Sequence, residues 1–242
     1  MRVLIISDIH ANITALDTVL AEAGKYDAVW CLGDLVGYGP DPNECITRVR
    51  QLPGIQCIIG NHDMAALQQL DSDSFNPEAR TAIVWTQKSL SESSRIFLQH
   101  LPEKIELADV TLAHGSPRHP VWEYLLDTRT ATYSFDFFDT PLCFVGHTHL
   151  PMIFSMNNSF YAATQTVPEA NKTIPTPQRA ILNPGSVGQP RDHDPRAAYA
   201  IYDTDSKTWE YRRVSYDVLA VQDRMREAGL PERHIQRIAA GW

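Results

Sequence analysis

The chain has 242 residues, of which 43% are hydrophobic and 21% are charged, and it carries a formal net charge of −8. A chain of this length and composition can bury a full core, so we expect a single domain over residues 1–242. The negative charge, with no basic run longer than Arg212-Arg213, excludes a surface that coats nucleic acid or binds an anionic membrane.

The apolar segments are too short for a membrane protein. None approaches the roughly 18 consecutive apolar residues that a membrane span requires. The first run, residues 3–6, is followed by Ser7 and Asp8, so it is also too short for the apolar part of a secretion signal. We therefore expect a cytoplasmic protein, and the sequence carries no signal for a particular oligomeric state.

Strand and helix patterns alternate along the first 113 residues. Short apolar runs, typical of strands buried on both faces, occur at residues 3–6, 28–32, 56–59 and 110–113. The intervening segments show the apolar spacing of helices at residues 16–23, 42–52, 77–89 and 91–101. This alternation predicts an α/β fold with parallel strands, and either Asn12 or Thr14 is expected to cap the first helix.

Residues 115–140 are rich in aromatic side chains and precede another apolar run at residues 142–145. Because crossovers of this length usually hold a helix, the aromatic residues could pack an ordinary crossover helix on the sheet. Alternatively, the segment could be a cap insertion that forms a lid over a functional site. The sequence leaves both interpretations open.

The pattern changes after Pro151. Strand patterns without intervening helices occur at residues 153–156, 159–163, 180–182, 198–202 and 208–214. They predict a mostly antiparallel second sheet. Residues 164–178, which contain three prolines, are predicted to form a loop or a long hairpin tip. Residues 216–242 hold two helical patterns, at 216–228 and 232–240, which are expected to cap the fold.

Five of the apolar runs end at residues that can bind a metal ion. In open α/β sheets, ligands gather at the carboxyl ends of the strands, so we expect these side chains to meet at one edge of one sheet. A single His or Asp at such a position is usually a hydrogen-bonded core or capping residue, but seven together indicate a metal site. The seven are Asp8, His10, Asp34, Asn61, His114, His147 and His149.

The number and type of these donors indicate two ions. Seven ligands exceed what one zinc ion takes and suit two divalent ions that share a carboxylate. Nitrogen and hard oxygen donors without thiolates favour Mn, Fe, Zn or Co. Such a pair would lower the pKa of a shared water and would attract a small phosphate ester into an otherwise acidic protein.

The ordered set of donor motifs resembles a known family signature. Asp8-x-His10, Gly33-Asp34, Gly60-Asn61-His62-Asp63, His114 after a strand, and Gly146-His147-x-His149 look like the five blocks of the calcineurin-like metallophosphoesterase superfamily. Residues 182–191 resemble a segment of its small bacterial and archaeal phosphodiesterase branch. In that segment, Asn183 and Ser186 are expected to hold backbone groups of a turn rather than to do chemistry.

The resemblance implies a fold and a role for each residue of the site. The fold would be a four-layer α/β/β/α sandwich of two mixed sheets, with a dinuclear site at the carboxyl edge of the strands. One metal would be bound by Asp8, His10, Asp34 and His149, and the other by Asp34, Asn61, His114 and His147. The resemblance also implies that His62 is catalytic, as a general acid or a stabiliser of charge at the leaving oxygen, and that Asp63 orients its ring.

One departure from the family bears on the substrate. The chain reads Gly33-Asp34-Leu35 and so lacks the Asp-Arg-Gly of the Ser/Thr protein phosphatases, whose arginine clamps phosphate. We therefore expect attack of a metal-bridging hydroxide on a phosphodiester, with Arg191 and Arg118 as candidate phosphate contacts. The alternatives are a protein phosphatase, a nucleotide pyrophosphatase, or a non-catalytic binding scaffold, of which the last is disfavoured because all the donors are retained.

Overall fold

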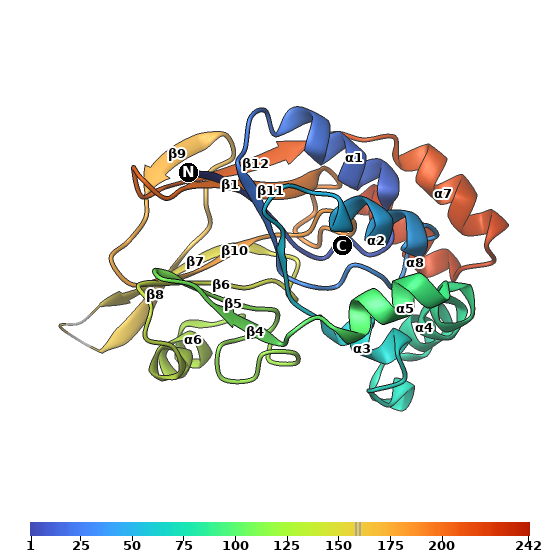
Figure 1. The fold of residues 1–242 in the computed structure, drawn as a ribbon, viewed down its shortest axis with the longest axis horizontal. Helices are drawn as coiled ribbons and strands as arrows, with labels where there is room; N and C mark the ends of the chain where they lie inside the picture. The colour runs from blue at the N-terminus through green and yellow to red at the C-terminus, as the bar shows by residue number, and fades with distance from the viewer. Residues whose placement is uncertain (158, 160) are drawn as a thin grey trace.

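The computed structural model describes residues 1–157, 159 and 161–242. Its strands form two six-stranded sheets. The sheets stack face to face, and helices cover both outer faces, so the order of layers is α/β/β/α (Figure 1). This confirms the predicted fold class.

The first sheet joins the start of the chain to its later strands. Its order is β3-β2-β1-β11-β12-β9. β1, β2 and β3 are parallel, whereas β11, β12 and β9 continue the sheet in antiparallel pairs. The bounds are β1 Arg2–Ile6, β2 Ala28–Cys31, β3 Gln56–Cys57, β9 Lys172–Pro175, β11 Ala197–Asp203 and β12 Thr208–Val214.

The second sheet has the order β4-β5-β6-β10-β7-β8. β5, β6 and β10 are parallel, and the outer pairs on both sides are antiparallel. Both sheets are therefore mixed. The bounds are β4 Lys104–Glu106, β5 Val110–Ala113, β6 Leu142–Phe144, β7 Pro151–Asn157, β8 Ala162–Thr166 and β10 Ala180–Pro184.

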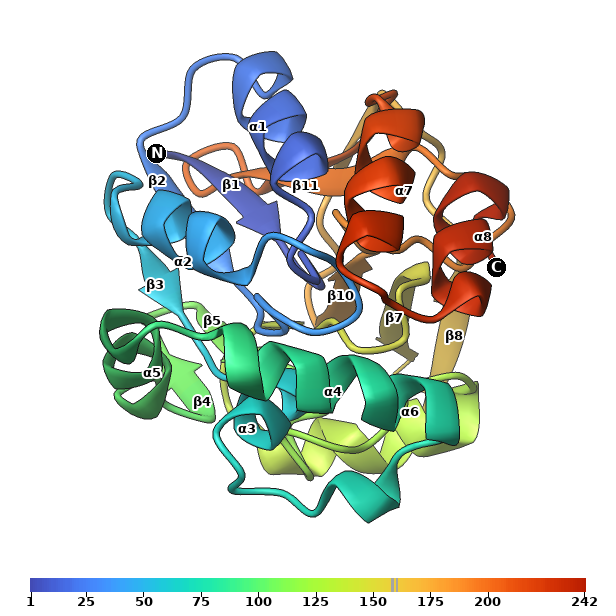
Figure 2. The same cartoon turned by 90° about the vertical axis from the view of Figure 1, so that its right-hand side faces the viewer.

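The helices form three groups. α1 (Ile13–Glu22), α2 (Pro42–Arg50) and α5 (Glu92–Gln99) pack on the first sheet, and α6 (Thr128–Ser134) with the 3-10 turn η2 (Phe135–Phe137) packs on the second. The others lie toward the edge where the parallel strands end, as Figure 2 shows. They are α3 Asn61–Ala66, α4 Pro77–Ser89, α7 Val218–Glu227 and α8 Glu232–Ala240, with the 3-10 turn η1 at Ser72–Ser74.

Several predicted elements are confirmed. α4 has the predicted bounds, and α5, α7 and α8 lie within the predicted ranges. The side chain of Asn12 caps α1 by accepting a hydrogen bond of 3.0 Å from the Ala15 amide. No helix within the described residues is long and apolar enough to cross a membrane.

The prediction that all donor-bearing strands share one sheet is wrong. β1, β2 and β3 belong to the first sheet, whereas β5 and β6 belong to the second. An apolar run indicates burial on both faces but carries no information about which sheet the strand joins. The donors converge nevertheless, because the parallel strands of both sheets end at the same edge of the sandwich.

The prediction of a separate antiparallel sheet after Pro151 is also wrong. β7, β8 and β10 extend the second sheet beside β6, whereas β9, β11 and β12 extend the first sheet beside β1. The segment 164–178, predicted as a loop or a long hairpin tip, holds β9 and the end of β8, which belong to different sheets. The strand predicted at 159–163 includes residue 160, which lies outside the described residues, and β8 begins at Ala162.

Aromatic packing holds the two sheets together. The ring of Phe144 on β6 is fully buried and lies 5.2 Å from that of Trp209, 5.3 Å from that of Tyr202 and 5.8 Å from that of Trp30, all on the first sheet. Aromatic pairs at such distances add to the free energy gained by burying their area. This cluster therefore sets the stacking of one sheet on the other.

We expect Phe144→Ala to lower the free energy of unfolding by about 3–5 kcal/mol, because it leaves a cavity between the sheets. Urea unfolding measures this change. Phe137→Ala is the matched control, since Phe137 is 48% exposed on η2 and its loss should change stability by less than about 0.5 kcal/mol. Equal effects of the two substitutions would contradict this account of the core.

Candidate metal centre

The strand ends bend sharply to present the predicted donors. Five of the seven adopt left-handed backbone conformations, with φ between 48° and 65°. Such conformations cost about 1–3 kcal/mol each for residues other than glycine, and they cluster at functional sites. The strained backbone conformations thus indicate that this edge of the sandwich serves a function and not stability. The five are Asp8, His10, Asp34, His147 and His149.

Two glycines allow the backbones to come together around the carboxylates. A Cβ on Gly60 would collide with the Asp34 carboxylate. A Cβ on Gly146 would collide with the Ser7 hydroxyl and lie 2.9 Å from Oδ2 of Asp8. Only glycine leaves space for these approaches.

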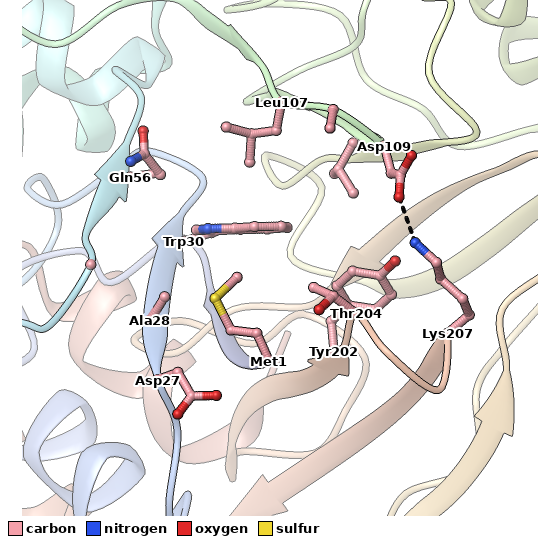
Figure 3. A pocket seen from close by; sticks show the side chains of 13 residues that line it. Met1, Asp27, Ala28, Trp30, Gln56, Leu107, Asp109, Tyr202, Thr204 and Lys207 are labelled. Carbon is pink, nitrogen blue, oxygen red and sulfur yellow. Dashed lines mark hydrogen bonds and ion pairs between the residues drawn. The ribbon is translucent and has the colours of Figure 1, made fainter.

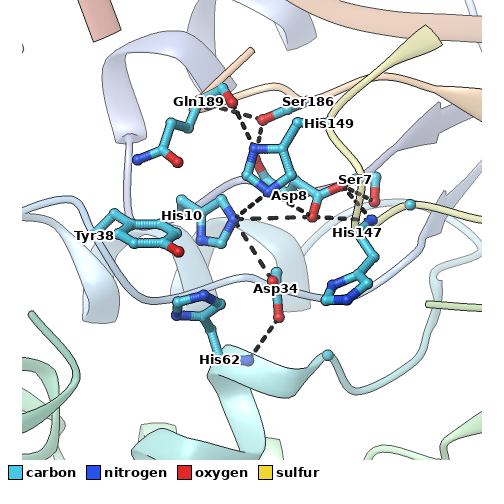
Figure 4. Close-up of polar contacts among 12 residues, drawn as sticks. Ser7, Asp8, His10, Asp34, Tyr38, His62, His147, His149, Ser186 and Gln189 are labelled. Carbon is cyan, nitrogen blue, oxygen red and sulfur yellow. Dashed lines mark hydrogen bonds and ion pairs between the residues drawn. The ribbon is translucent and has the colours of Figure 1, made fainter. Parts of the chain in front are cut away.

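The side chains meet in two adjacent groups. The ligand atoms of Asp8, His10, Asp34 and His149 lie within 4.8 Å of one another, and those of Asp34, His114 and His147 do likewise. Asp34 belongs to both groups. Figure 4 shows the imidazoles of His10 and His149 facing the carboxylates of Asp8 and Asp34.

Asn61 completes the second group. Its Oδ1 lies 3.1 Å from Nε2 of His114, and Nε2 of His114 lies 3.3 Å from Oδ2 of Asp34. The structure therefore brings together all seven donors that the sequence singled out, from both sheets and from the start of α3.

Hydrogen bonds to backbone carbonyl oxygens fix the orientation of three histidine rings. Nδ1 faces a backbone carbonyl oxygen in each: Val36 at 3.1 Å from His10, Gln189 at 2.5 Å from His149, and Leu32 at 2.7 Å from His114. Because a carbonyl oxygen can only accept, Nδ1 carries the proton. Nε2 of His10 and His149 is then the free acceptor, the arrangement that metal-binding histidines use.

The centre contains more hydrogen-bond acceptors than hydrogen-bond donors. The Nε2 atoms of His10 and His149 face each other at 3.1 Å. Oδ2 of Asp34 and Nε2 of His147 are buried without a hydrogen-bond partner. Buried acceptors without partners are costly, and cations would satisfy them. The donor set therefore fits divalent metal ions.

The pKa values show how the protein compensates charge around Asp34. Burial lowers the pKa of His10 to about 3 and holds those of His147 and His149 well below the ordinary value, so these rings are neutral. Burial also lowers the pKa of His114, but the Asp34 carboxylate beside it outweighs this effect and raises it to about 10. A proton on His114 therefore balances Asp34 when no cation does.

His62 lies at the start of α3 beside the donors. Its backbone amide donates to Oδ1 of Asp34 at 2.9 Å, and its ring lies 5.0 Å from that of His10 and 4.3 Å from that of Tyr38. Nδ1 of His62 is buried without a hydrogen-bond partner. The ring is thus fixed by packing and not by a polar contact at Nδ1.

Asp63 does not contact the His62 ring in the way that the resemblance implies. The carboxylate of Asp63 accepts hydrogen bonds from the backbone amides of Gly60, at 3.0 Å, and Val36, at 3.1 Å. It thereby caps the first turn of α3 and ties it to the loop after Asp34. Asp63 therefore positions the segment that carries His62 and makes no hydrogen bond to its ring.

The two arginines singled out from the sequence differ in environment. Arg118 is paired with Glu123. Arg191 donates to the Tyr38 hydroxyl at 3.4 Å and to Oε1 of Gln189 at 2.9 Å, and its Nε is buried without a partner. Burial is the main cause that lowers the pKa of His10, and the charge of Arg191 lowers it further, whereas Asp34 opposes both. Only Arg191 is thus placed to act beside the donors.

Supporting residues lie behind the donors, and Ser7 is the one among them that the sequence did not single out. Ser7 donates to Oδ2 of Asp8 at 2.7 Å. Ser186 donates to the Asp8 carbonyl at 2.8 Å and Asn183 to the Gly146 carbonyl at 2.7 Å, as expected of residues that hold backbone groups. The role of Ser7 could have been suspected only from its place beside Asp8 at a strand end.

A cavity of about 480 Å³ lies away from this centre, at the opposite ends of the strands (Figure 3). Trp30, Leu107, Tyr202 and Lys207 are among its lining residues, and none of the seven donors reaches it. The metal centre and this cavity are therefore separate features.

Comparison with known proteins agrees with the geometry. A family model described as the calcineurin-like phosphoesterase superfamily domain matches residues 1–207. The crystal structure of a metallophosphoesterase from Sphaerobacter thermophilus is 47% identical and covers 100% of both chains, with a TM-score of 0.92. An uncharacterised protein of Methanocaldococcus jannaschii is 36% identical, over 99% of this chain and 98% of its own.

A third similarity is partial. A symmetrical bis(5′-nucleosyl)-tetraphosphatase of Pectobacterium carotovorum is 32% identical over 97 residues, which are 38% of this chain and 34% of that protein. The fold and the donor set define a metal-dependent phosphoric ester hydrolase. The chain belongs to the calcineurin-like phosphoesterase superfamily, a family that depends on dinuclear metal centres.

Because Asp34 belongs to both donor groups, we expect Asp34→Asn to lower the content of both metal ions. His10→Ala should remove mainly one, since His10 belongs to a single group. Elemental analysis of the purified variants measures the stoichiometry. Asp223→Asn, which alters a carboxylate that is 70% exposed on α7, is the control and should keep both ions. Loss of one ion from Asp34→Asn and two from His10→Ala would overturn the shared position of Asp34.

Proposed function

We propose that this protein hydrolyses phosphodiesters with the help of two divalent ions. Asp8, His10, Asp34 and His149 would hold one ion, and Asp34, Asn61, His114 and His147 the other. The observation that carries the proposal is the position of Asp34 between two groups of buried donors. The nitrogen and oxygen donors favour Mn, Fe, Zn or Co.

Such ions supply Lewis acidity, which acidifies water and neutralises charge on phosphoryl oxygens. The protein supplies the attraction of the substrate. Four positive charges on the ions exceed the two negative charges of Asp8 and Asp34, and Arg191 adds another positive charge beside them. This local excess would draw an anionic ester to a chain whose net charge is −8.

The preference for a diester rests on which cations surround the centre. The loop after Asp34 continues with Leu35 and Val36, which are fully buried and apolar and cannot clamp phosphate. Of the two arginines considered, Arg191 alone lies beside the donors. A monoanionic diester needs less positive charge than a dianionic monoester, so it matches this site better.

His62 is the proposed group for the leaving oxygen. Its ring lies against those of His10 and Tyr38, and Nδ1 has no partner within the described part of the chain. We propose that the ring donates an N–H to the oxygen on which charge develops as the ester bond breaks. Asp63 supports this role indirectly by fixing the start of α3.

A second candidate function is hydrolysis of a pyrophosphate bond in a nucleotide. The partial similarity to symmetrical bis(5′-nucleosyl)-tetraphosphatases favours it. The same donors would serve both reactions, because in each case the attacked atom is phosphorus with one ester or anhydride oxygen leaving.

We expect a higher kcat/KM for bis(p-nitrophenyl) phosphate than for p-nitrophenyl phosphate, because the site offers few cations for a dianion. Release of p-nitrophenol by the metal-loaded protein measures both, and dinucleoside polyphosphates are tested beside them. A monoester cleaved with clearly higher kcat/KM than every diester would refute the preference. Preferential cleavage of a dinucleoside polyphosphate would support the second candidate.

We expect His62→Ala to keep both metals and to lower kcat by roughly 10²- to 10⁴-fold, as loss of a group that acts on the leaving oxygen does. His100→Ala is the matched control, because His100 is exposed at the end of α5 and its ring Nδ1 is hydrogen-bonded to the Ile96 carbonyl. Turnover by the His62 variant equal to that of the control would remove His62 from the mechanism.

A further inference from the structure

Three aromatic rings from two segments that are distant in the sequence lie around the candidate metal centre. Tyr124 stacks on His147, with ring centroids 3.9 Å apart and an angle of 23° between the planes. Phe75, which follows η1, lies 5.0 Å from His62 and 5.1 Å from Trp122. We call Phe75, Trp122 and Tyr124 the aromatic rim.

Two rings of the rim are exposed to solvent, whereas the histidine rings beneath them are buried. Trp122 is 37% and Tyr124 is 45% exposed, but His147 is 2% and His62 is 4% exposed. Large aromatic rings that stay exposed beside a polar centre gain little for the fold itself. Exposed apolar surface next to a functional site is typical of surface that a ligand covers.

The loop that carries two of the rim residues is held in place from within. Glu123 accepts a hydrogen bond of 2.6 Å from Ser116 and pairs with Arg118. Trp122 and Tyr124 flank Glu123 on either side, and both approach the ring of His147. The internal ion pair therefore presents the two rings to the centre, which gives Arg118 a structural role.

Positive charge lies on the inner side of the rim. The Arg191 guanidinium contacts the Tyr38 hydroxyl, and the Tyr38 ring lies 4.3 Å from that of His62, against which Phe75 of the rim packs at 5.0 Å. A ligand here would meet flat apolar rings on one side and, on the other, cationic groups that bind phosphate. A phosphate ester joined to a flat aromatic group matches both surfaces.

We propose that the aromatic rim binds the nucleobase of a phosphate ester, so that the substrates are nucleotide esters. This inference rests on the proposed function, because the metal centre and Arg191 would hold the phosphate of the same molecule. Stacking on aromatic side chains tolerates all bases, and its loss on alanine substitution typically weakens binding by about 5- to 150-fold.

The test is calorimetric titration of the full chain loaded with Mn²⁺, with adenosine 5′-monophosphate and with ribose 5-phosphate. The two compounds share the phosphate and the sugar and differ by the base. We expect the wild type to bind the nucleotide more tightly. Trp122→Ala should weaken nucleotide binding by about 5- to 150-fold and leave ribose 5-phosphate unchanged, whereas Trp122→Phe should keep most of the affinity.

Trp242→Ala is the matched control. Trp242 is also 37% exposed, and its ring contacts the guanidinium groups of Arg233 and Arg237. It should bind both compounds as the wild type does. Tyr124→Ala provides a second variant of the rim, with the same expected selectivity for the nucleotide.

Two results would overturn the inference. One is equal affinity of the wild type for the two compounds. The other is an equal loss of affinity for both compounds in Trp122→Ala, which would indicate that the rings close the site and do not bind the base. Hydrolysis of aliphatic diesters together with either result would leave the proposed function standing. Base-dependent binding by a protein that cleaves no ester would refute the proposed function and support the rim.

Discussion

The buried carboxylate of Asp34 is the constraint on which the rest of the site depends. It lies between two groups of metal-binding side chains, with imidazole nitrogens at 3.3 and 3.6 Å from Oδ2. A charge in this environment must be balanced. The protein can do so with a proton on His114, and the surrounding lone pairs make divalent cations the better partners.

Unfavourable backbone conformations and close backbone contacts create this arrangement. Strands of two different sheets end at one edge, left-handed residues turn the donors inward, and Gly60 and Gly146 let the backbones touch the carboxylates. Carbonyl oxygens behind the histidines then set which ring nitrogen faces the centre. Such preorganisation places the cost of assembling the site in folding and not in the binding of ions.

The donors could be predicted from the sequence because each follows an apolar run that is typical of a buried strand. Sheet membership could not, since the run preceding Asp34 and the run preceding His147 look alike yet join different sheets. The contact of Asp63 was missed because a carboxylate three residues after Gly60 can cap a helix or orient a ring, and only the fold brings the Val36 amide to it. The pairing of Arg118 with Glu123 depends likewise on the loop conformation.

We infer that these donors hold two cations in one pocket and share Asp34. Anomalous diffraction from crystals grown with Mn²⁺, recorded on both sides of the manganese absorption edge, tests it most directly. We expect two peaks roughly 3.5–4 Å apart, one beside His10 and His149 and the other beside His114 and His147. A single peak, or no peak at full Mn²⁺ saturation, would contradict it.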